Sequence, residues 1–149
     1  MPGQDFHTSF SVPQSAEEVF TAVTDPKRWW TGEIEGTATE VGDEFTYRYG
    51  EFHYSKQKVV ELIPDRRVVW QVLQSDLPGN GDPEEWTGTK ITFEIAQDQG
   101  QTELRFSHQG LVPQFECFDA CSGAWGFYIN GSLKRLITTG DGPSTPPWA

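Results

Sequence analysis

The sequence predicts an α+β domain in which a curved antiparallel sheet of six or seven strands wraps around one long C-terminal helix. Segments rich in β-branched and aromatic residues, joined by short connections, follow one another from residue 33 to residue 109. An apolar stripe with helical spacing then runs from about residue 117 to residue 139. A sheet with polar outer positions must bury its apolar face, and this helix is long enough to cover it.

The N-terminal part predicts one strand followed by two short helices. Residues 6–12 alternate between apolar and polar side chains, as a half-buried strand does. Ser15 followed by Glu18 forms a capping box, which opens a first short helix. Residues 27–30 predict a further helical turn whose two tryptophans fold over one end of the core.

Six more strands are expected between turn residues, at 37–41, 44–49, 52–63, 67–73, 87–96 and 102–108. The last two alternate most clearly, and their inward face carries Ile91, Phe93, Ile95, Leu104, Phe106 and His108. For residues 52–73 the inward face stays open, because paired valines put apolar side chains on both faces.

The long helix is expected to end at Gly140 and to bury the stripe Phe118, Cys121, Trp125, Tyr128, Ser132, Leu133, Leu136 and Ile137. Lys134 and Arg135 fall on its exposed side. Glycine costs about 1 kcal/mol against alanine inside a helix. Three of them, Gly123, Gly126 and Gly131, therefore indicate either close approach to another backbone or cavity, or mere tolerance of poor helix formers.

Composition bounds the class of protein. The 149 residues are expected to form a single domain, 1–149, with residues 141–149 as a flexible tail. A net charge of −11 argues against nucleic acid or an anionic membrane as partner, because both require clustered Lys and Arg. The sequence shows neither an apolar run of membrane-spanning length nor a signal peptide, so a cytoplasmic location is expected.

The two cysteines, Cys117 and Cys121, lie four residues apart on the predicted helix. A disulfide between consecutive turns would constrain little, and no second ligand pair completes a zinc site. Buried thiols are therefore favoured over half of a metal centre, and neither metal nor cofactor is expected.

Several short motifs together resemble one family. They include Val-Gly-Asp-Glu-Phe at 41–45 and Ser-His-Gln-Gly-Leu at 107–111, with further matches at 12–20, 25–30, 60–67 and 125–140. In order and spacing these segments resemble bacterial homologues of the activator of heat-shock-protein-90 ATPase, within the START and polyketide-cyclase-like (SRPBCC) superfamily. The resemblance implies a helix-grip fold with a hydrophobic cavity between the sheet and the long helix.

The first functional hypothesis is a binder of a hydrophobic or aromatic small molecule in that cavity. Its wall would comprise Trp30, Phe45, Tyr47, Tyr49, Phe93, Phe106, His108, Phe118, Trp125 and Tyr128. Apolar walls with a few polar tips are typical of small-molecule sites. The same aromatic residues are also what a solid core would contain.

Two alternatives belong to other classes. His108 points inward and is the candidate general base of a cyclase or isomerase, with a tyrosine to polarise a carbonyl. A single inward histidine is more often a structural hydrogen-bonding residue. The third hypothesis is a chaperone-interacting module like the heat-shock-protein-90 activator. The ligand and the oligomeric state do not follow from the sequence.

Overall fold

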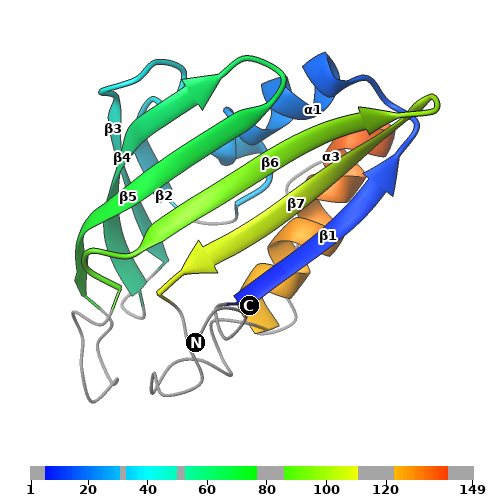
Figure 1. Ribbon diagram of the computed structural model, residues 1–149. Helices are drawn as coiled ribbons and strands as arrows, with labels where there is room; N and C mark the ends of the chain where they lie inside the picture. Colours follow the sequence, from blue (N-terminus) through cyan, green and yellow to red (C-terminus); the bar gives the residue numbers. More distant parts are fainter. Residues whose placement is uncertain (1–5, 31–32, 50–52, 77–85, 111–122, 141–149) are drawn as a thin grey trace.

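The computed structural model describes residues 6–30, 33–49, 53–76, 86–110 and 123–140. Seven antiparallel strands form one curved sheet with the order β1-β7-β6-β5-β4-β3-β2 (Figure 1). The strands are β1 (Phe6–Val12), β2 (Glu33–Gly36), β3 (Glu44–Tyr49), β4 (His53–Ile63), β5 (Arg67–Asp76), β6 (Lys90–Asp98) and β7 (Gln101–Gln109). The predicted fold class is confirmed.

The helices lie on the inner side of this sheet. Helix α1 (Ala16–Val23) and the 3₁₀ turn η1 (Pro26–Arg28) follow β1, as expected. The Ser15 hydroxyl accepts a hydrogen bond from the backbone N–H of Glu18 at 3.1 Å, so the predicted N-cap is present. Helix α1 contacts β6 and β7, and the end of the C-terminal helix contacts both α1 and β1.

The C-terminal helix is not a uniform α-helix. Residues 123–126 are α-helical, a π-helical segment η2 (Phe127–Leu133) follows, and α3 (Lys134–Thr139) ends at Gly140 in the left-handed conformation. Buried side chains recur in pairs every four residues, at 128/129, 132/133 and 136/137. Such a repeat drifts around a helix of 3.6 residues per turn, whereas a π segment holds more residues per turn and keeps the pairs facing the sheet. The predicted start, residues 117–122, lies outside the described residues.

The expected strand at residues 37–41 is wrong, because β2 is Glu33–Gly36 and the following residues form a loop. The Asp43 carboxylate accepts hydrogen bonds from the Thr37 hydroxyl at 2.8 Å and from the backbone N–H of Thr39 at 3.1 Å. These local bonds compete with a sheet ladder. Gly36 ends the strand at φ 103°, where a Cβ atom would lie 2.4 Å from the carbonyl oxygen of Glu44.

Strand register shows which side chains of residues 53–73 lie on the inner face, a point that the sequence left undecided. Tyr47 pairs with Ser55 and Phe45 with Gln57, so Ser55 and Gln57 lie on the inner face and are fully buried. Irregular pairing between β4 and β5 at Lys56/Gln57 and at Val59/Glu61 shifts the alternation. The expected inward residues of β6 and β7 are all buried. Apolar side chains fall on both faces because the register shifts within the strand pair.

The helical glycines do not mark close backbone contact. Among the described residues, a Cβ atom added at Gly123 or Gly126 would meet no heavy atom within 4 Å, and one at Gly131 would meet only the Phe127 ring at 3.8 Å. Within that part of the chain the expected close approach to another backbone is not found, and Gly123 and Gly131 are exposed.

Leu136 tests the register of the C-terminal helix. The expected exposure pattern is confirmed, since Leu136 is 5% exposed and Lys134 and Arg135 are exposed. Replacing Leu136 with Ala removes packed methyl groups, so we expect a loss of about 2–5 kcal/mol in the free energy of unfolding. Urea denaturation measures it, with Arg135→Ala as an exposed control that should change stability by less than about 0.5 kcal/mol. Equal effects of both substitutions would contradict this packing.

Candidate functional site

The predicted cavity residues lie together on the inner side of the sheet, except that Phe118 is outside the described residues. Tyr49 is partly buried, and the rest are at most 3% exposed: Trp30, Phe45, Tyr47, Phe93, Phe106, His108, Trp125 and Tyr128. Strands β3, β6 and β7, the residues after η1 and the C-terminal helix supply them. The fold thus brings these residues into one buried region.

Within that region the aromatic rings contact one another. Trp30 stacks on Tyr47 with ring centroids 3.9 Å apart and lies 5.1 Å from the Trp125 ring. Trp125 in turn lies 4.8 Å from the ring of Phe106. These contacts join the helix, β3 and β7 into one aromatic cluster, so these rings pack against each other rather than across an open space.

Three further tryptophans belong to the cluster, although sequence analysis did not count them among the wall residues. Trp29 lies parallel to Trp70 at 6.4 Å, and its indole N–H donates to the carbonyl oxygen of Ala22 at 3.0 Å. Trp86 meets His108 edge to face at 4.7 Å. Trp86 follows a long polar segment in the sequence, and its large indole could have indicated that the chain returns to the core there.

His108 is fully buried, and both of its ring nitrogens are engaged. The Trp125 indole N–H donates to Nδ1 at 3.0 Å, and Nε2 lies 2.7 Å from the Thr89 hydroxyl oxygen. That hydroxyl donates to the carbonyl oxygen of Trp86 at 2.6 Å, so Nε2 must carry the proton that Thr89 accepts. All three hydrogen bonds are therefore donated in the same direction, from the Trp125 indole through His108 and Thr89 to the Trp86 carbonyl. This arrangement leaves no imidazole lone pair available to a substrate.

The hydroxyl group of Tyr47 supplies a polar point inside the aromatic cluster. Burial raises the pKa of Tyr47 far above its ordinary value, and the neighbouring Tyr128 hydroxyl, to which it is hydrogen-bonded, raises it further. A hydrogen bond with Trp30 acts weakly in the opposite direction. Tyr47 therefore stays a neutral phenol at physiological pH. It is suited to donate a hydrogen bond and unsuited to remove a proton.

Gln57 Oε1 on β4 and Trp70 Nε1 on β5 are buried polar atoms of the inner face that have no hydrogen-bond partner among the described residues. Both side chains are 0% exposed. The amide nitrogen of Gln57 donates to the Ser55 hydroxyl, which leaves its oxygen as a spare acceptor. The indole N–H of Trp70 is a spare donor. The sequence indicates neither residue, because apolar side chains on both faces of residues 52–73 leave the inward face undecided.

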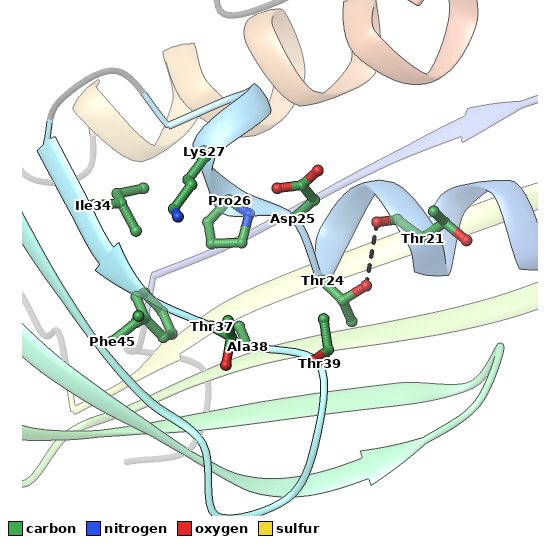
Figure 2. A pocket seen from close by; sticks show the side chains of 11 residues that line it. Thr21, Thr24, Asp25, Pro26, Lys27, Ile34, Thr37, Ala38, Thr39 and Phe45 are labelled. Atoms are coloured by element: carbon green, nitrogen blue, oxygen red, sulfur yellow. Dashed lines mark hydrogen bonds between the residues drawn. The ribbon is translucent and has the colours of Figure 1, made fainter.

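A pocket of about 320 Å³ lies elsewhere, between η1 and β2 (Figure 2). We call it the η1–β2 pocket. It is lined by the end of α1, by η1, by β2 and the loop after it, and by Phe45: Thr21, Thr24, Asp25, Pro26, Lys27, Ile34, Gly36, Thr37, Ala38, Thr39 and Phe45. Phe45 alone is shared with the predicted cavity wall.

The described ranges contain no group of three or more His, Cys, Asp or Glu residues placed to hold a metal ion. Cys117 and Cys121 fall outside these ranges. Within the same ranges, no helix has the length and apolar character needed to cross a membrane.

Substitution of His108 distinguishes a structural role from a catalytic one. His108→Gln disrupts the chain from Trp125 to Thr89 and leaves buried polar groups unpaired, so we expect the free energy of unfolding to fall by about 1–3 kcal/mol. Ser107→Ala, at the preceding residue on β7 and on its other face, serves as the control in chemical denaturation. Native stability together with loss of a turnover seen in the parent protein would instead establish a catalytic histidine.

Comparison with known proteins places the chain in a family. The sequence model described as "Activator of Hsp90 ATPase homolog 1-like protein" matches residues 13–138. No curated protein matches the chain. Among solved structures, the Aha1 dimer from Colwellia psychrerythraea is 29% identical, with a TM-score of 0.75, and the match covers 93% of this chain and 98% of that one.

Two further structures show the fold alone. DynU16, a putative protein in the dynemicin biosynthetic locus, is 21% identical with a TM-score of 0.68, over 94% of this chain and 49% of that chain. CalU16 from Micromonospora echinospora is 19% identical with a TM-score of 0.66, over 95% and 76%. Since the family model spans most of the sequence, the chain belongs to the family of Activator of Hsp90 ATPase homolog 1-like proteins.

Proposed function

We propose that this protein binds a hydrophobic, aromatic small molecule between the inner face of the sheet and the C-terminal helix, without transforming it. The observation that carries the proposal is the pair of buried polar atoms, Gln57 Oε1 and Trp70 Nε1, that lack a partner among the described residues. Buried polar atoms are normally hydrogen-bonded, because an unmade bond costs about 1–3 kcal/mol. A mostly apolar ligand with one donor and one acceptor would satisfy both.

The surroundings of these atoms fit such a ligand. Gln57 and Trp70 lie on neighbouring strands, and Trp70 meets Phe45 and Phe93 edge to face at 4.9 Å. Tyr47, whose phenol stays neutral, lies two residues after Phe45 on β3 and is buried on the same inner face, where its cross-strand partner is Ser55. Rigid aromatic walls with a few fixed polar groups favour flat ligands that carry hydroxyl or carbonyl groups.

The π-helical segment is a second observation in favour of a ligand site in this region. Tyr128, Ile129, Ser132 and Leu133 are its buried residues, and Ser132 donates to the carbonyl oxygen of Trp29 at 2.6 Å. π segments are rare and are found frequently at functional sites. Here the segment faces the aromatic cluster, where separation of helix and sheet would admit a ligand.

A catalytic function has less support from the geometry. A cyclase or isomerase needs a group that accepts a proton from the substrate. The Nδ1 lone pair of His108 already accepts the Trp125 indole N–H, and burial keeps Tyr47 protonated. We therefore favour binding over turnover at this site.

Gln57→Met tests the binding proposal, because methionine keeps the length of the side chain and removes the unpaired amide oxygen. Binding of the neutral fluorophore N-phenyl-1-naphthylamine, measured by fluorescence titration, should weaken about two- to tenfold, the equivalent of one hydrogen bond. Lys56→Met, on the opposite face of β4, is the matched control. Native mass spectrometry of freshly purified protein should show a retained small molecule. Absence of probe binding to the parent protein would refute the proposal.

The family favours a second candidate, stimulation of a chaperone ATPase. It rests on the match of residues 13–138 to the activator family, and the net charge of −11 suits a basic partner surface. We expect the ATP hydrolysis rate of a bacterial heat-shock protein 90 to rise when this protein is added. The increase should shrink as salt screens the charges. An unchanged rate at low salt, with heat-denatured protein as the control, would exclude this function.

A further inference from the structure

The η1–β2 pocket is lined by apolar groups at its base. Pro26 is buried, Ala38 is 2% exposed and Phe45 is 1% exposed, and Ile34 covers one side as a half-buried residue. Figure 2 shows these four side chains around the same space. The volume of about 320 Å³ falls in the range of sites for small molecules, about 300–1,000 Å³.

The loop after β2 forms one wall of the pocket, and hydrogen bonds to Asp43 hold this loop in place. Asp43 binds the Thr37 hydroxyl and the backbone N–H groups of Thr39 and Glu40. The hydrogen bond from Thr37, with those from the backbone, holds the pKa of Asp43 below its ordinary value, so the carboxylate stays charged and keeps its donors. Thr37, Ala38 and Thr39 are thereby fixed before any ligand arrives, which lowers the entropy cost of binding.

Two charged residues line the pocket, Asp25 and Lys27, and they lie on different sides of Pro26. Figure 2 shows the Lys27 ammonium group beside Ile34 and Pro26, at the pocket, whereas the Asp25 carboxylate lies on the side of Pro26 away from Phe45. Among the described residues Lys27 forms no ion pair, although the chain carries twice as many acidic as basic residues, 22 against 11. An unpaired cation above an apolar base matches a ligand with one anionic end and one apolar end.

We propose that the η1–β2 pocket is a second binding site, which takes a small hydrophobic monocarboxylic acid. The apolar body of the acid packs against Phe45, Ile34 and Ala38, and its carboxylate binds the Lys27 ammonium. The site is separate from the aromatic cluster and does not depend on a ligand there. An arylalkanoate such as 3-phenylpropionate combines the required anionic and apolar ends in a small molecule.

Titration of ¹⁵N-labelled protein with 3-phenylpropionate, followed by two-dimensional amide NMR, tests the site. The amide signals of Thr24, Thr37 and Ala38 should shift. The neutral 3-phenylpropanamide should bind about two- to fivefold more weakly, as expected for one exposed ion pair. Lys27→Met should weaken acid binding by the same factor and leave amide binding unchanged, whereas Lys90→Met, an exposed lysine outside the pocket, should change neither.

A second variant blocks the pocket without touching its buried base. Thr21 is exposed on α1 and lines the pocket, so Thr21→Trp should keep the fold and abolish the acid-dependent shifts. The proposal is overturned if those shifts persist in Thr21→Trp. It is also overturned if the parent protein shows no shifts, if acid and amide bind equally, or if the shifts map to Trp125 and Tyr128 instead. The neutral fluorophore reports on the aromatic cluster, so failure at either site is recognised separately.

Discussion

The insertion of Trp125 between the sheet and the neighbouring tryptophans is the contact on which the rest of the structure depends. Its ring meets Phe106 of β7 and Trp30 beyond η1, and it lies nearly parallel to Trp86 at 5.8 Å. Its indole N–H donates a hydrogen bond to Nδ1 of His108. One side chain thus anchors the helix to the sheet by apolar area, by ring geometry and by a hydrogen bond. Aromatic pairs contribute about 0.5–1.5 kcal/mol each beyond their buried area.

Polar groups inside this aromatic environment are held in two different ways. The chain from Trp125 through His108 and Thr89 to a backbone carbonyl is complete, and a complete buried network stabilises the arrangement it joins. Gln57 and Trp70 each keep one polar atom without a partner among the described residues. The first arrangement explains why a buried histidine need not be a base. The second leaves two polar atoms of the inner face available to a ligand.

Sequence reasoning recovered what depends on local pattern. The strict alternation of β6 and β7, the Ser15 cap and the exposure of Lys134 and Arg135 follow from side-chain period and capping chemistry. It failed where a local alternative competes. At residues 37–41 the side chain of Asp43 recruits the backbone, and the β-propensity of the threonines there does not prevail.

The candidate site was less accessible to sequence reasoning, for geometric reasons. Alternation identified Phe93, Phe106 and His108 as inward, but not whether their rings touch, since contact depends on the distance between helix and sheet. Gln57 alternates regularly with Ser55 and Val59 on the buried face, but the sequence did not identify this face, because the adjacent Val59 and Val60 are both apolar and Ser55 and Gln57 are polar. In the C-terminal helix, buried pairs repeat every four residues, which departs from the 3.6 residues per turn of an α-helix. The sequence stripe also fits an ordinary α-helix approximately, so it did not predict the π segment.

Phe45 links the two candidate sites physically. It forms part of the base of the η1–β2 pocket, and it also packs edge-on against Trp70, whose indole N–H has no hydrogen-bond partner among the described residues. One ring therefore contacts both the outer pocket and the aromatic cluster. Phenylalanine suits this position, because its rigid ring presents apolar surface on both sides and adds no polar atom to either. The same strand carries Tyr47 two residues further on, so β3 supplies both a ring shared by the two regions and a polar hydroxyl of the inner site.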